Sequence, residues 1–503
     1  MSAQAASTSP QDPPPPPTTE TKHPKGLYIL FGAEAWERFS YYGMRALLVL
    51  YLTSQLHYRD EDALELYGIS TSLVYLTPIL GGFLSDRILG QRKAVIIGGT
   101  VMALGHLAMA FEPLLHVALG LLIVGNGFFK PNISTIVGGL YHENDPRRDG
   151  GFTIFYMGIN LGAFFAPIVC GPLGEQVSWH LGFAAAGVGM MCGLAVFIAG
   201  QKLLGPVGWP PKTDRKAFIA RDWIDISLWT AGSVLFVLGA IQLFTALGPY
   251  WTPLPWFAKI PIVLVLGALF FAGPILTQPK DPSQAPLSRE DIHCIVVIAI
   301  LTFFNIFFWM GFEQAGGTMT LFAERQTDRH LFGWEIPASM FQSINPLGIV
   351  VMAPIFSRLW IKLDQPGSKL ATSTPTKMAL GMIILGVGFI LMFFAQKLAE
   401  AEGSVGPLWL AAVYFIHTIG ELCLSPIGLS MVTKLAPARL GSLMMGLWFV
   451  QSAIANYLAG TLEHMVEQFH LPVYGVLIAT SIGAGLVLLL VRPFLNSWMH
   501  GRG

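Results

Sequence analysis

The sequence predicts an all-α protein that crosses a membrane many times, and two properties of the chain support this prediction. Hydrophobic residues make up 53% of the 503 positions and charged residues only 12%, about half the charged share of an ordinary soluble domain. The apolar residues fall into runs of about 20, the length at which a helix spans the hydrocarbon core of a bilayer. A lipid bilayer is therefore the expected surrounding of most of the chain.

Fourteen apolar segments are long enough to span the bilayer. Several contain proline, as at Pro78, Pro131 and Pro426, which membrane helices tolerate when neighbouring groups satisfy the freed backbone. Short loops separate most of these segments, and no stretch between them has the length of a soluble domain. The predicted spans are 27–56, 64–86, 93–112, 115–140, 151–172, 180–204, 223–247, 256–278, 291–324, 337–362, 376–398, 407–435, 441–465 and 473–496.

Lysine and arginine are distributed unevenly between the two sides of these spans. Twenty-two of the 30 lie on the side that carries both ends of the chain, five lie on the other side, and three lie within spans. Positive residues collect in the cytoplasmic loops of membrane proteins. The distribution therefore predicts that both termini of this multi-pass plasma-membrane protein are cytoplasmic.

The longest loops divide the chain into four parts. Residues 1–25, which include five consecutive prolines, are expected to form a disordered cytoplasmic tail. Residues 26–204 and 290–500 hold six spans each, and residues 205–289 form a linker with two further transmembrane helices. The expected layout is six, two and six helices.

Composition and motifs exclude several classes of function. The net charge is zero and no basic patch is interleaved with aromatic residues, so no nucleic-acid partner is expected. The four cysteines lie inside apolar segments without CxxC spacing, which indicates buried small side chains rather than metal ligands. The chain has no HExxH, GxSxG or nucleotide-phosphate loop, so it is not expected to be an enzyme.

The most informative residues are charges inside the spans. Glu34, Arg38, Tyr41 and Arg45 are spaced four, three and four residues apart, so a helix presents them along one stripe, with Glu37 beside it. A charge at the centre of a bilayer costs about 2.5 kcal/mol or more. Such residues therefore face a water-filled cavity or one another, and they mark a transport pathway.

Three further charges lie within later spans. They are Lys130 in GNGFFKPNIST, Glu313 in FFWMGFEQAGGT and Glu421 in HTIGELCLSPIGLS. Four carboxylates and three cations thus lie on the first, fourth, ninth and twelfth spans. A scaffold protein would leave these seven buried charges unexplained, so we expect them to surround one cavity.

The loop after the second span, GGFLSDRILGQRK (81–93), resembles the G-x-x-x-D-R-x-G-R-K loop of the major facilitator superfamily. Its charged positions hold Asp86, Arg87, Arg92 and Lys93, which are expected to gate the structure by exchanging ion-pair partners. The resemblance implies a major facilitator fold of two six-helix bundles plus two inserted transmembrane helices. The four charged spans then correspond to helices 1, 4, 7 and 10, which line the central cavity of that fold.

Six further blocks resemble the proton-dependent oligopeptide transporter family. They follow the family order across nearly the whole membrane region, and the inserted helix pair resembles the bacterial members. The resemblance implies a symporter that imports di- and tripeptides with protons, by alternating access, across the bacterial inner membrane. It would act as a monomer and would need no cofactor besides the proton. The blocks are EAWERFSYYG (34–43), which matches the ExxERFxYYG signature, FFKPNIST (128–135), FYMGINLGAF (155–164), FFWMGFEQ (307–314), FQSINPLGIV (341–350) and GELCLSPIGLS (420–430).

The same resemblance implies roles for individual residues in binding peptide. The cations Arg45 and Lys130 would hold the peptide carboxylate, for which the planar fork of arginine is well suited, and Glu421 would hold the amino terminus. Asparagines would hydrogen-bond the peptide backbone, and aromatic residues would line the site. The residues implied to contact peptide are Arg45, Lys130, Glu421, Asn160, Asn345, Tyr41, Tyr42, Tyr75, Ser425, Trp309 and Trp448.

Four residues match the proton-coupling groups of the family. Glu34, Glu37 and Arg38 form its proton-linked triplet, and Glu313 matches the carboxylate that pairs with the cation at position 45. Protonation of Glu313 is expected to release Arg45 for the peptide, while protons on Glu34 and Glu37 enable the return step.

Other interpretations remain open at this point. Relatives in the broader family carry nitrate, drug-like molecules or other metabolites, and an intramembrane enzyme or a proton channel is a more distant alternative. Three histidines have structural explanations: His417 is expected to be a hydrogen-bonded core residue, and His106 and His293 are expected at the membrane interface.

Overall fold

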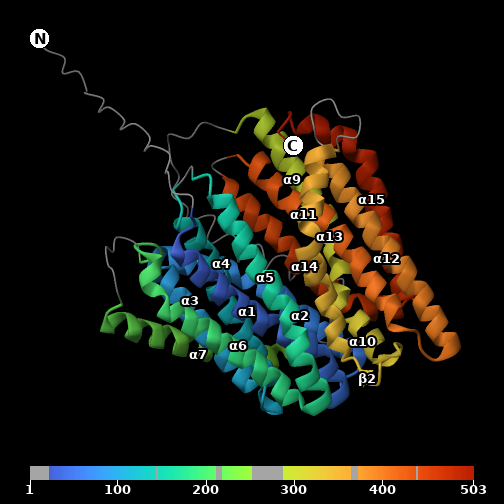
Figure 1. Ribbon diagram of the computed structural model, residues 1–503, viewed down its shortest axis with the longest axis horizontal. Coiled ribbons are helices and arrows are strands. Elements are labelled where there is room, and N and C mark those ends of the chain that lie inside the picture. Colours follow the sequence, from blue (N-terminus) through green and yellow to red (C-terminus); the bar gives the residue numbers. More distant parts are fainter. Residues whose placement is uncertain are drawn as a thin grey trace, which may run out of the picture.

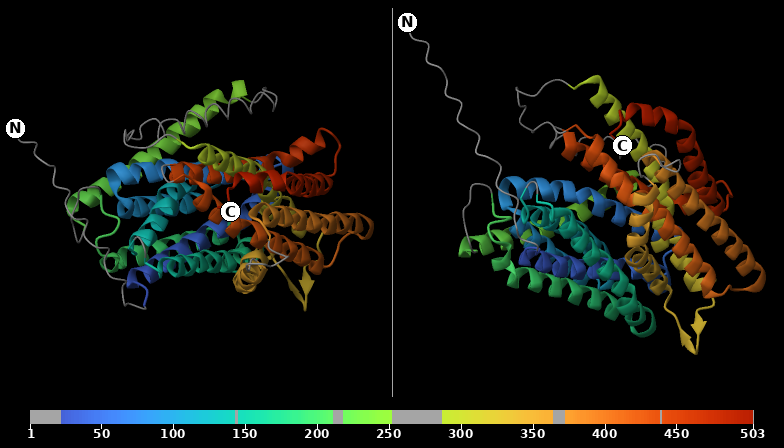
Figure 2. Two further views of the ribbon diagram at one scale, coloured as in Figure 1. Left: turned by 90° about the horizontal axis from the view of Figure 1, so that it is seen from above. Right: turned by 45° about the horizontal axis from the view of Figure 1, so that its top comes forward.

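The computed structural model describes residues 22–142, 145–210, 218–251, 287–363, 372–437 and 440–502. It consists almost entirely of long helices that form two bundles side by side (Figure 1). Figure 2 shows the earlier helices on one side of the molecule and the helices from α9 onward on the other. The expected all-α, two-bundle major facilitator fold is confirmed, with one short β-hairpin added.

The N-terminal bundle contains six helices that pack mainly against their neighbours in this bundle. Short π-helical turns follow the first, second and fifth of them, at Tyr51–Gln55, Ser85–Leu89 and Leu173–Val177. The helices are α1 Lys25–Leu50, α2 Asp60–Leu84, α3 Gln91–Ala108, α4 Leu115–Gly139, α5 Arg148–Pro172 and α6 Trp179–Ala199.

The C-terminal bundle contains the helices from α9 to α15 and a β-hairpin between two of them. Strands β1 (His330–Leu331) and β2 (Trp334–Glu335) pair antiparallel, and a 3-10 helix, Ala338–Ser343, follows them. The helices are α9 Arg289–Phe312, α10 Thr318–Arg325, α11 Ile344–Leu363, α12 Thr374–Glu402, α13 Pro407–Leu435, α14 Gly441–Glu467 and α15 Val473–Trp498.

One inserted helix, α7 (Ala220–Trp251), lies outside the N-terminal bundle against α3 and α4. Most of this helix faces outward, since only 17% of its apolar stretch is buried inside the protein. The second inserted span, predicted at 256–278, lies outside the described residues. Helices occupy the other thirteen predicted spans.

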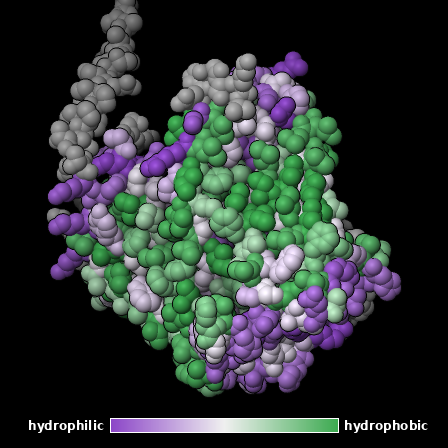
Figure 3. Space-filling view, turned by 45° about the vertical axis from the view of Figure 1, so that its right-hand side comes forward, coloured by the Kyte–Doolittle hydropathy of each residue, from purple (hydrophilic) through white to green (hydrophobic). Residues whose placement is uncertain are grey.

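Ten of the helical segments in the described residues are long and apolar enough to cross a membrane. Figure 3 shows hydrophobic side chains over the middle of the molecule and hydrophilic ones toward its ends. A transmembrane helix needs this apolar belt because lipid tails cannot solvate polar groups. The protein is therefore a multi-pass membrane protein.

Two predicted segments differ in detail from the structure. The ninth span, predicted over 291–324, corresponds to the helical stretch Arg289–Arg325, but a 3-10 turn, Glu313–Gly316, interrupts it between α9 and α10. The predicted tail 1–25 includes residues that are held in place: the backbone carbonyl of Lys22 accepts a hydrogen bond of 2.6 Å from Arg147, and α1 begins at Lys25. Residues 1–21 lie outside the described part of the chain.

The molecule has two ends, which we name by the chain segments that lie there. The terminal face is the end where α1 begins and α15 ends, and the distal face is the end with the β-hairpin (Figure 1). The two bundles meet where α2 lies against α14 and where α5 lies against α11. Gly68 and Gly460 permit the closest crossing, because a Cβ on Gly68 would lie 2.6 Å from the Cα of Gly460.

Candidate functional site

Helix α1 carries a compact cluster of buried charges formed by Glu34, Glu37 and Arg38, each at most 1% exposed. The guanidinium of Arg38 donates two hydrogen bonds to the carboxylate of Glu37, at 2.5 and 2.6 Å, and its Nε lies 3.5 Å from Glu34. Asn126 of α4 donates a further bond of 3.2 Å to Glu37. Glu37 is thus fully engaged, whereas Oε2 of Glu34 is enclosed and has no hydrogen-bond partner among the residues that the structure describes.

The close packing of α5 against α1 helps to bury this cluster. A Cβ on Gly162 of α5 would lie 2.1 Å from the carbonyl oxygen of Ala35 and 2.9 Å from the Cβ of Arg38. Only glycine allows the two backbones to approach so closely. Inside such a low-dielectric site, ion pairs are stronger than in water, and an unpaired charge costs more.

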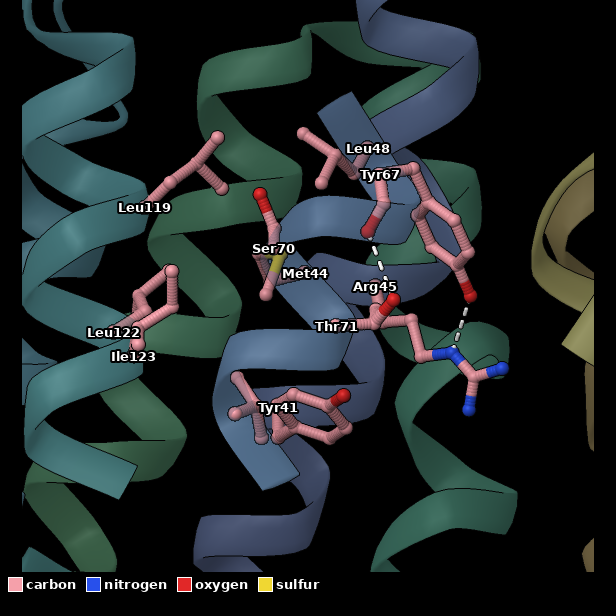
Figure 4. A pocket seen from close by; sticks show the side chains of 11 residues that line it. Tyr41, Met44, Arg45, Leu48, Tyr67, Ser70, Thr71, Leu119, Leu122 and Ile123 are labelled. Carbon is pink, nitrogen blue, oxygen red and sulfur yellow. Dashed lines mark hydrogen bonds between the residues drawn. The ribbon is translucent and has the colours of Figure 1, made fainter. Parts of the chain in front are cut away.

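The second group of charges joins the two bundles. Arg45, near the middle of the first span, forms an ion pair with Glu313, and the two side chains are 9% and 3% exposed. The Nε of Arg45 also donates a 2.6 Å hydrogen bond to the hydroxyl of Tyr67 on α2 (Figure 4). Glu313 comes from the 3-10 turn after α9, so this ion pair crosses from one bundle to the other.

The break in the ninth span explains how Glu313 reaches Arg45. A Cβ on Gly316 would lie 1.9 Å from the hydroxyl oxygen of Tyr67 and 3.3 Å from Nε of Arg45. Glycine at this position therefore lets the turn lie directly against the Arg45–Tyr67 pair. A continuous α-helix with a larger residue there would push the two bundles apart.

A small cavity of about 10 Å³ lies beside Arg45 within the N-terminal bundle. Figure 4 shows Tyr41, Tyr67 and Arg45 along one part of its wall and aliphatic side chains of α4 opposite them. The polar end of this wall is therefore formed by Arg45 and its tyrosine partners. The remaining lining is Met44, Leu48, Ser70, Thr71, Val74, Leu119, Leu122 and Ile123.

Lys130 supplies the third cation of the N-terminal bundle from α4. It is partly buried, and its Nζ lies 5.8 Å from the ring centroid of Tyr75. Lys130 of α4 therefore faces the aromatic ring of Tyr75 on α2. The cation–π contact also places Tyr75 among the predicted site residues.

The C-terminal bundle provides the remaining carboxylate. Glu421 of α13 is 8% exposed and accepts a 2.8 Å hydrogen bond from the amide of Asn345 at the start of α11. Asn345 also donates to the hydroxyl of Thr418, one turn before Glu421, at 3.1 Å. Ser425, one turn after Glu421, has an enclosed hydroxyl without a hydrogen-bond partner.

Tyr42 lies beside the ion pair that joins the bundles. It is partly buried, and the Cζ of Arg45 lies 5.6 Å from the centroid of its ring. Arg45 of α1 and Glu313 of the turn after α9 therefore meet beside Tyr42, while the contact of Glu421 is with Asn345 of its own bundle.

The other predicted peptide-site residues have more local contacts. Asn160 donates a 3.0 Å hydrogen bond to the carbonyl of Tyr156 in its own helix, and the rings of Tyr41 and Tyr42 meet edge to face at 5.3 Å. Trp309 packs against aromatic neighbours of α9. Trp448 lies against α13, where a Cβ on Gly428 would come within 2.3 Å of its ring.

The predicted gating residues lie at the terminal face, and two of them, Arg92 and Lys93, bind the inserted segment. Arg92 donates to the carbonyls of Val207 and Gly205 at 2.6 Å each and lies over the ring of Trp209. Lys93 contacts Asp222 and Asp225 of α7 at 2.8 Å each. Asp86 accepts a hydrogen bond from Gln91, and Arg87 lies over the ring of Phe83.

Two residues that the sequence did not single out support the site. Tyr67 and Asn126 are direct partners of Arg45 and Glu37, but a tyrosine or asparagine in a span gives no signal until its partner is known. His106, which was expected at the membrane interface, is buried inside the N-terminal bundle. It is 1% exposed and its Nε2 lies 2.5 Å from the hydroxyl of Ser40 on α1.

The arrangement favours an organic ligand with charges at both ends. Within the described residues, no group of three or more His, Cys, Asp or Glu side chains could hold a metal ion. The N-terminal bundle supplies Arg45 and Lys130, and the C-terminal bundle supplies Glu313 and Glu421. Opposite charges on opposite sides of one region can hold a zwitterion and orient it.

Comparison with known proteins agrees with this geometry. The family model described as the POT family matches residues 92–219 and 279–477. The chain belongs to the POT family.

Two relatives and one solved structure show how far the similarity extends. The chain is 36% identical over 512 residues to the peptide transporter YePEPT of Yersinia enterocolitica, covering 96% of each chain. It is 34% identical over 493 residues to the di-/tripeptide transporter of Lactococcus lactis, covering 94% of this chain and 96% of the relative. A crystal structure of peptide transporter POT in complex with sulfate matches with a TM-score of 0.78 and 36% identity, covering 97% and 98% of the two chains.

Proposed function

We propose that this POT-family protein is a proton-coupled symporter that imports di- and tripeptides by alternating access. The observation that supports it most strongly is the buried ion pair between Arg45 and Glu313, which joins the two bundles. A buried ion pair is stable only while both partners are charged, so adding a proton to Glu313 removes its attraction for Arg45.

Arg45, once released, becomes available for the carboxylate of a peptide. Lys130 of α4 adds a second positive charge, and the neighbouring tyrosines supply hydroxyl groups and ring faces. At the other side of the site, Glu421 holds the amino group of the peptide, and Asn345 orients the carboxylate of Glu421. The peptide side chains then lie between these two fixed points, where they can vary.

The triplet Glu34, Glu37 and Arg38 provides a second place for protons. Oε2 of Glu34 has no hydrogen-bond partner, so it is the oxygen of this triplet that can accept a proton without breaking a bond. A proton moved down a potential of 100 mV releases about 2.3 kcal/mol, which can concentrate a substrate roughly fifty-fold.

The proposal includes an orientation and a setting. The terminal face is cytoplasmic and the distal face is external, in the inner membrane of a bacterium, and each monomer carries one complete pathway. No cofactor other than the proton takes part, and the activity is transport without covalent chemistry.

Reconstituted vesicles test this function directly. Purified protein in liposomes should accumulate labelled dialanine when the vesicle interior is alkaline or negative, and should only equilibrate it without a gradient. Unlabelled dipeptides should compete, while nitrate should not. Equal accumulation with and without a proton gradient or membrane potential would refute coupling, and competition by nitrate but not by dipeptides would favour transport of another solute.

A further inference from the structure

A carboxylate outside the site described above lies between the bundles at the distal face. Glu175 belongs to the π-helical turn Leu173–Val177 that follows α5, and its side chain is 11% exposed. Its Oε2 accepts a 2.6 Å hydrogen bond from the backbone N–H of Ala338. Its Oε1 accepts bonds from the backbone N–H and the hydroxyl of Ser339, at 3.0 and 2.5 Å.

The surroundings of Glu175 hold it against the C-terminal bundle. The guanidinium of Arg329 lies 3.8 Å away, and the neighbouring Gln176 donates a 2.6 Å bond to the carbonyl of Glu335. A Cβ on Gly171 would lie 2.5 Å from the hydroxyl oxygen of Ser339, so glycine allows the end of α5 to approach this point. One carboxylate thus links two bundles through three short hydrogen bonds.

Two other polar side-chain pairs between the bundles at this face are more exposed. Arg325 pairs with Asp60 at 47% and 36% exposure, and His464 meets Glu61 at 48% and 23% exposure. Solvent-exposed pairs contribute little because water screens them, whereas hydrogen bonds to a buried charge are stronger. Glu175 should therefore contribute more to closing the distal face than either of these pairs.

We propose that Glu175 is the positioning residue that latches the distal face shut, acting through the backbone of Ala338 and Ser339. The proposal rests on alternating access, as proposed above, because the distal face must open once in each cycle. Opening separates α5 from the 3-10 helix Ala338–Ser343, and all three hydrogen bonds must then break together. The latch sets how often the closed pathway opens to the outside.

The conformational effect can be measured as a distance across the distal face. Spin labels are attached to cysteines replacing Leu114 of the N-terminal bundle and Leu408 of the C-terminal bundle, both of which are exposed, in a protein whose four native cysteines are replaced by alanine. Glu175→Gln keeps the shape of the side chain but removes its charge. We expect the ratio of distal-open to distal-closed molecules to rise about tenfold, and about threefold for Ser339→Ala.

A matched control is Glu400→Gln. Glu400 is a half-exposed glutamate that pairs with Lys397 of its own helix at 2.7 Å, so it does not join the bundles. Its substitution should leave the distance distribution unchanged. An unchanged distribution in Glu175→Gln, or an equal shift in Glu400→Gln, would overturn the latch.

Transport measurements separate this inference from the proposed function. Glu175→Gln should retain dipeptide binding, because the substitution lies outside the peptide site, while its proton-driven uptake falls several-fold. If the unsubstituted protein fails to couple dipeptide uptake to protons, the proposed function fails. If it couples normally and Glu175→Gln opens no more often, only the latch fails.

Discussion

The two bundles contribute charges to the site in different ways. In the N-terminal bundle, Glu34, Glu37 and Arg38 satisfy one another on a single helix, with Asn126 of the same bundle as a further donor. In the C-terminal half, Glu313 depends on Arg45 of the opposite bundle, and Glu421 depends on the neutral amide of Asn345.

This difference suggests a division of labour. A cluster that carries its own counter-ion keeps its geometry whether or not a ligand is present, so it suits the storage of protons. A carboxylate whose partner lies on another element loses that partner when the elements move or when a ligand competes. Glu313 and Glu421 are therefore suited to report ligand binding and conformational change.

Replacing Arg45 should break this arrangement most severely. Arg45→Met leaves Glu313 buried without its cation and removes the guanidinium that we propose receives the peptide carboxylate. We expect proton-driven dipeptide uptake to fall by more than about 100-fold, which corresponds to roughly 2.7 kcal/mol or more. Uptake into proteoliposomes and dipeptide binding by calorimetry should both be lost.

Arg45→Lys is the graded control for that experiment. It keeps the charge but cannot form the planar two-point contact, so partial uptake with weaker binding is expected. Full activity in Arg45→Met would show that the ion pair between the bundles has no role in transport.

Substitutions in the triplet of Glu34, Glu37 and Arg38 should reduce the coupling of uptake to protons more than they reduce dipeptide binding. Glu37→Gln breaks the two-point contact with Arg38 and leaves that guanidinium poorly compensated. Proton-driven uptake should fall about tenfold or more, while exchange of labelled for unlabelled dipeptide without a gradient continues. Proton-driven uptake and dipeptide exchange should be measured in the same vesicles, so that a loss of coupling can be told from a loss of transport.

Glu34→Gln sharpens the same comparison. Glu34 lies 3.5 Å from Arg38 and has one oxygen without a partner, so its substitution should disturb the folded protein less than Glu37→Gln does. Thermal unfolding of the two variants should show the larger loss for Glu37→Gln. Equal loss of exchange and driven uptake in both variants would assign the triplet to structure rather than to coupling.

The smallest effect is expected at Asn345. Asn345→Ala removes the amide that donates a hydrogen bond to Glu421 but leaves the charged side chains of the site in place. The apparent affinity for dialanine should fall about five- to tenfold, in line with the loss of one hydrogen bond to a charged group, with the maximal rate nearly unchanged. A fall in the maximal rate with unchanged affinity would mean that Asn345 acts in the conformational step instead.

Much of the fold could be predicted because hydrophobicity and length dictate it. Runs of about 20 apolar residues form helices in a bilayer whatever their neighbours are, and thirteen of the predicted spans correspond to helices. The break at Glu313–Gly316 does not follow from hydrophobicity and length, and the contact of this turn with Tyr67 of another helix became visible only in the structure. The position of α7 likewise depends on Lys93 meeting Asp222 and Asp225.

The sequence by itself determined which charges are buried and on which helices they lie, because the cost of placing a charge in lipid depends only on the residue and its span. It also carried the motifs by which the family was identified. Only the tertiary structure decided the partners: Arg45 with Tyr67, Glu421 with Asn345, and Glu175 with the backbone of the opposite bundle. Ion pairs and hydrogen bonds act over a few ångströms, so they are set by how helices distant in sequence pack together, and no spacing along the chain encodes that distance.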